Sequence, residues 1–504
     1  MDYWIGIDMG TTATKAVLYT GSGAIVATQS IAYTLYRDPS GMAEEAPEDI
    51  FDAVVATIRA VSEKLTAADK LCAIGFSAQQ HSLIATTSDF NPLTRVITWA
   101  DTRANAAATA LRNADQGHNI FMRTGTPIQP MSPLSKLHWL KHDQPDLFQA
   151  ADHFMDIKTY VFHRLFGVYK LDLSLASATG LYHLEKQQWD QDILDLLGLS
   201  LDQLPEIVSP YAFESGLSLA DAQMMHIPPE TPFVWGAADG PMSNLGVAAI
   251  QPGIAALTIG TSGAIRVMTN QPIVDEKMRT FTYALDETHW VVGGATNSGA
   301  SVLAWLKEKI FDDRITLDTM TQMAASISAG SGGLIFHPYL GGERAPIWDA
   351  TARGSFFGLG YEHGQAEMTR AVLEGISYNI HAIAVALEEV VGELKHIQAT
   401  GGFTNSEIWL QILADIFDMP IHIPDSQEAG CLAAVILSQK ALGVMASFDE
   451  VTQLVTTRAV YTPLTEHLST YRELEALYTD LLTHYQTTYG KLSEFKRRDR
   501  KSVV

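Results

Sequence analysis

Two short turns hold the residue types in this chain that are best suited to phosphate chemistry. The first turn, Gly10-Thr11-Thr12, follows the run Ile5-Gly6-Ile7-Asp8-Met9 and precedes Lys15. The second turn, Gly260-Thr261-Ser262, follows a similar apolar run. A tight glycine turn between strands directs backbone N–H groups and hydroxyl donors outward, and a lysine adds positive charge. We therefore predict that phosphate is bound by Gly10, Thr11, Thr12, Lys15, Gly260, Thr261 and Ser262.

Two aspartates stand at the carboxyl ends of predicted strands. Asp8 lies beside the first turn, where a carboxylate is suited to hold Mg²⁺ directly or through water. Asp239 follows the strand 231–235 among small residues, where open α/β sheets bind ligands. Phosphoryl transfer to an alcohol needs a carboxylate that orients the hydroxyl and accepts its proton. We predict Asp8 as the metal ligand and Asp239 as the general base. The alternatives are that Asp8 only caps its turn and that Asp239 only caps a helix.

Two polar loops follow further predicted strands. Gln79, Gln80 and His81 come after the strand 71–76, and Trp99, Asp101 and Arg103 come after the strand 96–98. Fork-shaped polar side chains beside an aromatic ring suit a substrate with many hydroxyl groups, because each buried hydroxyl needs a partner. We therefore predict that both loops bind such a substrate, while a structural role for His81 stays open.

The elements that must position these residues alternate between β-rich runs and amphipathic helices, which is typical of an α/β fold. Pro47 begins a predicted helix that continues to Leu65, and a long buried helix is predicted from Met368 to Val391. Each phosphate turn joins two β-rich runs. We therefore predict a duplicated fold of two halves, with a boundary within 246–253 and a cleft between the halves; chance similarity of two short turns is the alternative.

Composition and missing motifs exclude several classes of protein. With 34 basic and 57 acidic residues the net charge is −23, so we expect no nucleic-acid partner and no membrane partner. Two cysteines are too few for a disulfide framework or a zinc site. The amino terminus has no secretion signal and no long apolar run occurs, so we expect a cytoplasmic protein. No P-loop or dinucleotide motif is present, and the strand predicted after Ser262 argues against a hydrolase elbow there.

With these residues assembled, the chain resembles the FGGY carbohydrate kinase family of the actin-like ATPase superfamily, from Ile5 to about Gly443. The family's first signature is similar to residues 131–139 and its second to residues 354–374. The resemblance implies two actin-like, ribonuclease H-like α/β domains with a catalytic cleft between them. It places a sugar-binding domain at 1–247, a nucleotide-binding domain at 248–445, and a helical extension with a basic tail at 446–504.

The resemblance also implies an enzyme that transfers a phosphoryl group from ATP, with Mg²⁺, to an alcohol group of a small sugar or sugar acid. The phosphate turns and Asp8 would face the ATP phosphates and the metal, and Asp239 would be the base. The adenosine side would use Gly299, Gly402 and Asn405. Family members are often dimers or tetramers, which leaves a homodimer open.

Within the family, the segments 80–84, 98–103, 123–127 and 259–266 are similar to those of gluconokinases, which convert gluconate to 6-phosphogluconate. The residue before His81 is usually Met, and here it is Gln80. Xylulokinases tend to have Gly where this chain has Ser82. A cation should face the carboxylate of gluconate, and the candidates Arg103, Arg123 and Arg266 stay open. The alternatives are a xylulokinase or another pentulose kinase and, from another class, a catalytically silent nucleotide-binding scaffold.

Overall fold

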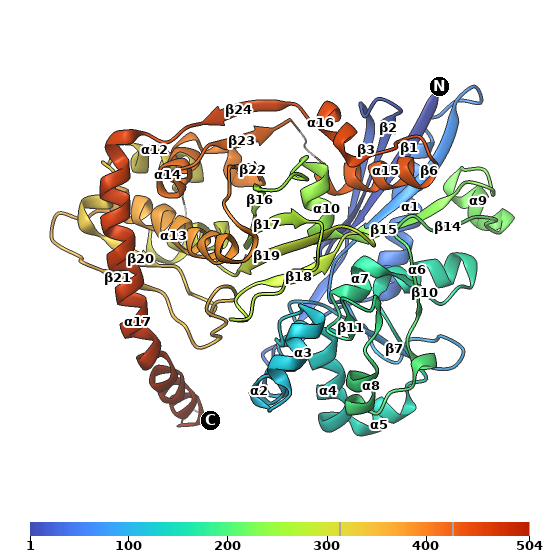
Figure 1. The fold of residues 1–504 in the computed structure, drawn as a ribbon, viewed down its shortest axis with the longest axis horizontal. Coiled ribbons are helices and arrows are strands. Elements are labelled where there is room, and N and C mark those ends of the chain that lie inside the picture. The colour runs from blue at the N-terminus through green and yellow to red at the C-terminus, as the bar shows by residue number, and fades with distance from the viewer. Residues whose placement is uncertain (312–313, 426–427, 503–504) are drawn as a thin grey trace. The chain divides into compact units, whose positions relative to one another are not determined.

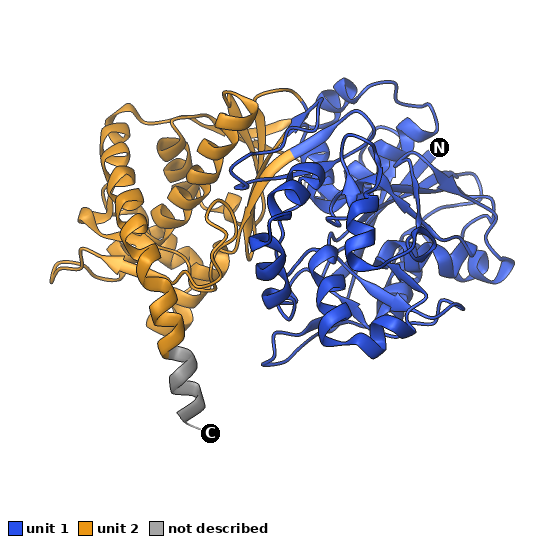
Figure 2. Ribbon diagram, turned by 60° about the horizontal axis from the view of Figure 1, so that its bottom comes forward, with its two compact units in different colours: residues 1–250, 268–291, 426–455 blue, residues 251–267, 292–425, 456–504 orange. Residues whose placement is uncertain are grey.

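The computed structural model describes residues 1–311, 314–425 and 428–502, with side chains described up to residue 495. Contacts divide the chain into two compact units (Figure 2): unit 1 is Met1–Ile250, Met268–Val291 and Ser426–Val455, and unit 2 is Gln251–Val267, Val292–Asp425 and Thr456–Val504. Each unit is discontinuous in sequence, and the domain boundaries at 247 and 445 stay a prediction. The side chains of the basic tail, from Lys496 on, lie outside the described ones.

The central sheet of unit 1 has six strands in the order β14-β15-β6-β1-β2-β3. Their bounds are Phe213–Glu214 (β14), Phe233–Ala238 (β15), Lys70–Ala78 (β6), Asp2–Met9 (β1), Ala13–Thr20 (β2) and Ile25–Ala32 (β3). β1, β6 and β15 are parallel neighbours, whereas β2, β3 and β14 pair antiparallel. The parallel strands are apolar and mostly buried, as expected for a sheet covered on both faces.

The three parallel strands end at one edge of this sheet. Register places Met9 beside Ala78, and Ala78 beside Ala238. The residues that directly follow these three are Gly10, Gln79 and Asp239. Because only β6 separates β1 from β15, the two outer strands are about 10 Å apart. The first phosphate turn, the Gln-Gln-His loop and the predicted base therefore leave the sheet at the same edge.

A helix from the last fifth of the chain covers one face of the sheet. Helix α15 (Ala429–Ala441) packs on β1 and β6 (Figure 1). Gly6 and Gly75 are register partners on these strands. A Cβ at Gly6 would lie 2.0 Å from the carbonyl oxygen of Cys431, and one at Gly75 would lie 2.2 Å from that of Ala434. The paired glycines thus form a shallow groove that lets the helix backbone approach the sheet.

The other elements of unit 1 surround this sheet. The helices are α1 (Pro47–Ser62), α2 (Asn105–Asn113), α3 (Gly117–Thr124), α4 (Pro133–Asp143), α5 (Pro145–Ala150), α6 (Ile157–Phe166), α7 (Leu173–Ser177), α8 (Gln191–Leu197), α9 (Leu219–Met225), α10 (Asp239–Gly246) and α16 (Val451–Leu454). The small sheets are β4 (Leu35–Arg37), β5 (Ala43–Glu45) and β8 (Val96–Ile97); β7 (Ile84–Thr86) with β9 (His153–Met155); β10 (Lys170–Asp172) with β13 (Glu206–Val208); and β11 (Tyr182–His183) with β12 (Gln188–Trp189). Strand β18 is Phe281–Ala284.

Unit 2 has its own sheet, in which the order β19-β17-β16-β22-β23-β24 runs over Trp290–Thr296, Gly263–Thr269, Ile254–Ile259, His396–Thr400, Ile421–Pro424 and Thr457–Tyr461. β16, β22 and β23 are parallel neighbours. The helices are α11 (Ala300–Trp305), α12 (Leu317–Ala325), α13 (Gln365–Val391), α14 (Glu407–Phe417) and α17 (Thr465–Ser502), and β20 (Ile335–His337) pairs with β21 (Ser355–Phe357).

Both units are built on the same hairpin, as the sequence predicts. β1 and β2 flank residues 10–12, and β16 and β17 flank residues 260–262. In each unit the first strand of the hairpin pairs in parallel with a later strand, β6 or β22. The predicted helix from Pro47 is α1, and the predicted long helix lies within α13. The strand after Ser262 is also present, so no hydrolase elbow forms there.

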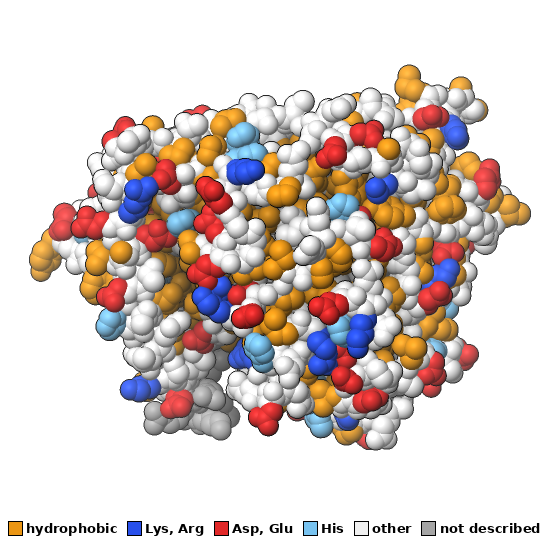
Figure 3. Space-filling view, viewed as in Figure 1, with side chains coloured by type: hydrophobic (Ala, Val, Ile, Leu, Met, Phe, Trp, Pro, Cys, Tyr) orange, Lys and Arg blue, Asp and Glu red, His pale blue; other side chains and the backbone are white. Residues whose placement is uncertain are grey.

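Two observations bear on partners. On the face shown in Figure 3, acidic and basic side chains are interspersed with apolar ones, so no field of a single sign covers that face. Among the described helices, none combines the length and the apolar character that a bilayer crossing requires.

Candidate functional site

The first phosphate turn is held in one shape by backbone hydrogen bonds. The Gly10 N–H donates to the Ala13 carbonyl at 3.1 Å, and the Tyr33 N–H donates to the Thr12 carbonyl at 3.1 Å. The Tyr33 hydroxyl donates to the Gly10 carbonyl. A Cβ at Gly10 would come no closer than 3.4 Å to its nearest neighbour, so the glycine leaves space at the turn and is not needed to relieve a clash.

Asp8, the predicted metal ligand, lies one residue before the end of β1. Its Oδ1 accepts a hydrogen bond from the Ser77 hydroxyl at 2.9 Å. A Cβ at Gly430 would lie 2.9 Å from Oδ2, so the glycine at the start of α15 keeps this side of the carboxylate uncrowded. Burial raises the pKa of Asp8, and the Ser77 hydrogen bond and the positive charge of Lys15 oppose that rise.

These surroundings fit a magnesium ion. Mg²⁺ is commonly bound through one or two carboxylates together with substrate phosphates and water. Among the described residues no group of three or more His, Cys, Asp and Glu side chains converges, and a site at Asp8 would have phosphate and water as further ligands. Asp8 supplies a carboxylate beside the phosphate turn, and Gly430 leaves room next to it.

Lys15 already has a carboxylate partner in unit 1. Its register partner across the hairpin is Asp8, and its Nζ lies 2.7 Å from Oε2 of Glu428. Burial alone would lower the pKa of Lys15, but the hydrogen bond and charge of Glu428 outweigh it and raise the pKa. The lysine therefore stays charged beside the turn.

Asp239 lies where the sequence predicts, directly after β15 and at the first position of α10. Its Oδ1 accepts a hydrogen bond from the Gly240 N–H at 2.7 Å. A carboxylate in the first turn of a helix interacts favourably with the helix dipole, which stabilises the ionised form that a general base needs. Asp8 and Asp239 thus share one edge of one sheet, with the loop after β6 between them.

The loop after β6 holds His81 in an unusual backbone conformation. The residue has φ = 67°, in the left-handed region that residues other than glycine rarely adopt. Its Nδ1 lies 2.8 Å from the Ala178 carbonyl. Because a carbonyl only accepts, we assign the proton of the neutral ring to Nδ1, which leaves Nε2 to accept from the Tyr283 hydroxyl at 3.5 Å. Next to it, Nε2 of Gln80 is buried and has no hydrogen-bond partner among the described residues.

Lys136 of α4 holds the loop after β6 through a hydrogen bond to its backbone. The side chain is fully buried, and its Nζ donates to the carbonyls of His81 and of Ile97, the latter at 3.0 Å. Ile97 ends β8 and leads into the loop of Trp99. Burial lowers the pKa of Lys136 to about 7. One buried amino group therefore ties the two predicted sugar-binding loops together.

The second of these loops contacts the phosphate turn. The Trp99 indole N–H donates to the Thr11 hydroxyl at 2.7 Å. Asp101 and Arg103, predicted as separate substrate ligands, pair with each other: Nη2 of Arg103 lies 2.7 Å from Oδ2 of Asp101 and 2.5 Å from Oε1 of Glu44. Their contact with substrate stays a prediction.

The arginines proposed to face a carboxylate differ in their surroundings. Arg123 Nε lies 2.6 Å from Oδ2 of Asp190, a buried carboxylate that also caps α8. Arg103 has two carboxylate partners, as described above. Arg266 lies on β17 in unit 2. Two of the three candidate cations thus already have carboxylate partners within unit 1.

In unit 2, the second phosphate turn packs on the segment before α11. The Gly260 N–H donates to the Ser262 carbonyl at 2.8 Å, and the Ser301 hydroxyl donates to the Thr261 carbonyl at 2.7 Å. A Cβ at Gly299 would lie 2.7 Å from the Gly260 carbonyl oxygen, so only glycine allows this approach. Thr261 itself is exposed.

Gly402 and Asn405 begin and end a short turn (Gly402–Asn405) after β22, next to the second phosphate turn because β22 is the parallel neighbour of β16. A Cβ at Gly401 would lie 2.3 Å from the Ile259 carbonyl oxygen, whereas one at Gly402 would meet nothing within 4 Å. Gly401 is thus required by packing, and Gly402 leaves exposed backbone beside open space. That is the surface that a flat ring such as adenine needs.

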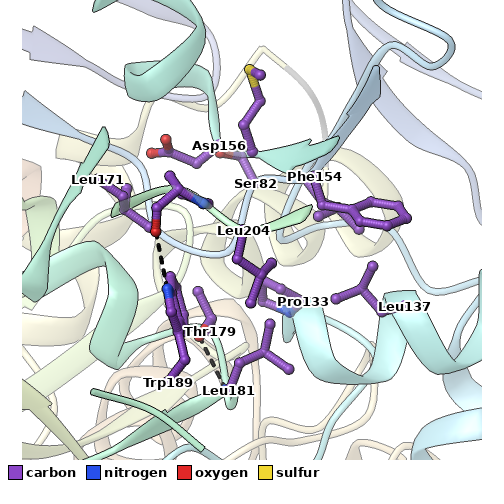
Figure 4. Close-up of a pocket in the computed structure, with 13 residues that line it drawn as sticks. Ser82, Pro133, Leu137, Phe154, Asp156, Leu171, Thr179, Leu181, Trp189 and Leu204 are labelled. Atoms are coloured by element: carbon purple, nitrogen blue, oxygen red, sulfur yellow. Dashed lines mark hydrogen bonds between the residues drawn. The ribbon is translucent and has the colours of Figure 1, made fainter. Parts of the chain in front are cut away.

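A small cavity lies behind the His81 loop. Asp156, Ser82 and Leu171 line one side of it, and Trp189, Thr179 and Leu181 line the other (Figure 4). Its volume of about 30 Å³ is room for one or two water molecules and far too small for a sugar acid. The Ser82 hydroxyl accepts from the Ile157 N–H at 3.2 Å and so ties the loop to α6. The cavity is therefore not the substrate pocket, and the residues around it hold the His81 loop in place.

Sequence reasoning missed several residues that support the site. Lys136 lies inside the first signature but was not expected to contact the loops. Nothing in the local sequence marks Glu45 or Glu428, because their partners are distant in the chain. Gln79 was predicted with the polar loop as a substrate ligand, but its hydrogen bonds with the Thr11 hydroxyl and with Glu45 were not predicted.

The FGGY family of carbohydrate kinases matches the chain twice, with its N-terminal domain at residues 3–246 and its C-terminal domain at residues 255–442. A gluconokinase of Bacillus subtilis (strain 168) is 42% identical over 505 residues, covering 98% of each chain. A xylulose kinase of the same strain is 28% identical over 501 residues, covering 99% of this chain and 100% of its own.

Solved structures agree with this picture. A gluconate kinase from Lactobacillus acidophilus is 40% identical with a TM-score of 0.94, covering 97% of this chain and 99% of that one. A ligand-bound xylulose kinase from the same organism is also 40% identical with a TM-score of 0.94, covering 98% of this chain and 100% of that one. The chain belongs to the FGGY family of carbohydrate kinases, enzymes that transfer a phosphoryl group to an alcohol group and use ATP as the donor.

Proposed function

We propose that this protein is a gluconokinase, which transfers the γ-phosphoryl group of ATP to the terminal hydroxyl of gluconate. The observation that carries the acceptor's identity is the 42% full-length identity to the curated gluconokinases, against 28% to the curated xylulose kinase of Bacillus subtilis. The buried Nε2 of Gln80 has no hydrogen-bond partner among the described residues and can donate to a hydroxyl or carboxylate oxygen of the acceptor.

In the proposed reaction, Asp239 orients the acceptor hydroxyl and takes its proton as the oxygen attacks phosphorus. The ionised form favoured at the start of α10 suits this role. The phosphates are bound by the backbone of residues 10–12 and by Lys15, and in unit 2 by residues 260–262. Gly299, Gly402 and Asn405 are proposed for the adenosine side.

We propose Asp8 as the residue that holds Mg²⁺. When bound, the ion would neutralise negative charge on the phosphates during transfer. The Ser77 hydroxyl fixes the orientation of the Asp8 carboxylate, and Lys15 supplies positive charge on the neighbouring strand.

On the acceptor side, Trp99 offers an aromatic ring, and His81 offers an imidazole that contacts with the Ala178 carbonyl and the Tyr283 hydroxyl hold in place. The strained φ of His81 costs free energy that the Lys136 and Ala178 contacts offset, so the ring is oriented before substrate binds. Pre-oriented partners suit a substrate whose hydroxyls must each be matched.

The second candidate is a xylulokinase, because a structural relative with 40% identity and a TM-score of 0.94 carries that name. A coupled ADP-release assay across gluconate, xylulose, ribulose and glycerol separates the two. We expect gluconate to give the highest kcat/KM. A kcat/KM for xylulose equal to or above that for gluconate would assign the acceptor to the pentuloses instead.

The role of Asp239 is tested with Asp239→Asn. We expect kcat to fall by about 10²–10⁴-fold, because the proton acceptor is lost while the shape is kept. The dissociation constant of ATP, measured by calorimetry, should stay within error of wild type. If the variant keeps the wild-type kcat, Asp239 is not the base. A wild-type protein that is inactive on the whole panel would instead support the silent-scaffold alternative.

A further inference from the structure

Three hydrogen bonds connect the predicted sugar loop to the phosphate turn and then to a buried carboxyl. Trp99 donates to the Thr11 hydroxyl, as described above, and that hydroxyl donates to Oε1 of Gln79 at 3.2 Å. Nε2 of Gln79 donates to Oε2 of Glu45 at 2.7 Å. All four side chains belong to unit 1.

The directions of these bonds decide what Thr11 can do. An indole N–H can only donate and an amide oxygen can only accept, so the single hydroxyl proton of Thr11 goes to Gln79. The Thr11 hydroxyl therefore already donates its only proton and accepts one hydrogen bond. Thr11 is left with its backbone N–H for a phosphate, and its side chain works as a link between two parts of the site.

The chain of hydrogen bonds closes into a ring through the backbone. Glu45 is the last residue of β5 and is the register partner of Val96 on β8. β8 leads through Thr98 directly to Trp99. The ring thus fixes three segments against one another: the phosphate turn, the end of β6 and the sugar loop.

Glu45, which anchors the ring, lowers the stability of the fold because it is a buried carboxyl group, and this argues for a role beyond stability. Glu45 is fully buried and Gln79 is 1% exposed. Oε1 of Glu45 has no hydrogen-bond partner among the described residues, and a buried polar atom in that state destabilises the fold. Burial raises the pKa of Glu45 to about 8, so near pH 7 the group is largely a neutral acid.

We propose that Glu45 and Gln79 are positioning residues that couple binding of the sugar to binding of the nucleotide. The inference rests on the proposed function, in which the sugar contacts Trp99 and the phosphates contact the Thr11 turn. A sugar packed on Trp99 restricts the indole and, through the ring, the turn. The nucleotide then loses less conformational freedom on binding, and the reverse holds by linkage.

The coupling is measured by calorimetry with a non-hydrolysable ATP analogue and Mg²⁺, with and without saturating gluconate. In wild type we expect gluconate to lower the dissociation constant of the analogue by about 5-fold or more. Gln79→Met and Glu45→Met break the ring and should bring this ratio close to 1. Glu45→Gln keeps an acceptor oxygen and the shape of the neutral acid, and should restore most of the coupling.

Two results would overturn the proposal. One is a folded Glu45→Met protein with the wild-type ratio. The other is loss of coupling in Glu45→Gln as complete as in Glu45→Met, since a general packing defect and not the hydrogen bond would then be responsible. If the methionine variants do not fold, Trp99→Phe removes only the indole donor, and a wild-type ratio in that variant counts equally against the ring.

Failure of the proposed function gives a different pattern. If wild type phosphorylates another sugar faster than gluconate, the acceptor assignment is wrong and that sugar replaces gluconate in the coupling experiment. If wild type phosphorylates its acceptor but shows a ratio of 1, the function stands and the ring proposal is wrong. A wild-type protein inactive on the whole panel overturns both.

Discussion

A buried ionisable side chain near the site, that of Lys136, forms its hydrogen bonds with the backbone of two loops and holds them in place. Lys136 donates to two backbone carbonyls, those of His81 and Ile97. Burial lowers the pKa of Lys136 to about 7, so its amino group is only partly charged at neutral pH, and the cost of desolvating it limits what it adds to stability. Its value lies in fixing the distance between the His81 and Trp99 loops.

Replacing Lys136 with Met should therefore affect substrate binding more than folding. A hydrogen bond contributes about 0.5–1.5 kcal/mol and Lys136 donates two, so we expect KM for gluconate to rise by about 10-fold. KM for ATP should change much less. Steady-state kinetics with each substrate varied in turn measure this split.

The matched control is Lys141→Met on the same helix. Lys141 also donates to a backbone carbonyl, that of Leu196, away from the two loops. Its KM values should stay at the wild-type level. Equal KM values for Lys136→Met and wild type, in a folded protein, would contradict the positioning role.

At this scale the sequence predicts positions better than partners. Asp8 and Asp239 were placed correctly because both stand where an apolar run ends. The pairing of Lys15 with Glu428 could not be predicted, since 413 residues separate them. The ion pair between Glu44 and Arg103 could not be predicted either, because the two residues are distant in the sequence.

Among the elements, the long helix α17 is anchored through a buried histidine of β20. His337 is fully buried, its Nε2 lies 3.0 Å from the Tyr478 carbonyl, and its ring stacks on that of Tyr478 with centroids 4.2 Å apart. Burial lowers the pKa of His337 to about 4 from the ordinary 6.5. The imidazole is neutral in the folded protein at neutral pH.

This histidine makes unit 2 sensitive to acid. Because the pKa is lower in the folded than in the unfolded state, the unfolded state binds the proton first. Stability is therefore lost as the pH falls from about 6.5 towards 4, by up to about 3 kcal/mol. Urea unfolding at several pH values should show a smaller acid loss in His337→Phe than in wild type.

The control for this pH series is His484→Gln, at an exposed position of helix α17. Its pH dependence should follow wild type. Parallel curves for wild type and His337→Phe would mean that other groups cause the acid sensitivity.

The elements show where sequence patterns are sufficient. α1 and α13 were predicted because their apolar residues recur with helical spacing. The assignment of α15 to the first sheet could not be predicted, because its sequence is apolar on nearly all sides and shows no face that selects a partner.

At the scale of the whole molecule, the repeated hairpin was enough to predict two related halves, but not how the chain is shared between them. Unit 1 regains residues 426–455 after the chain has built most of unit 2. The paired glycines of β1 and β6 explain this return, since they form a surface for a helix backbone. A fragment that ends near residue 247 lacks that helix.

We therefore expect the fragment 1–247 to lack a cooperative fold. Without α15, buried apolar residues of β1 and β6 would be exposed to water. The expected outcome is a broad thermal transition with strong binding of a hydrophobic dye, in contrast to the full chain. A sharp transition and low dye binding in the fragment would show that the sheet does not depend on α15.

The late arrival of α15 has a consequence for synthesis in the cell. At about 5–20 residues per second, a ribosome needs roughly 20–70 s to pass from the end of β6 to the start of α15. During that interval the glycine groove of the nascent sheet has no helix to fill it. We expect chaperones to shield this surface until translation is nearly finished.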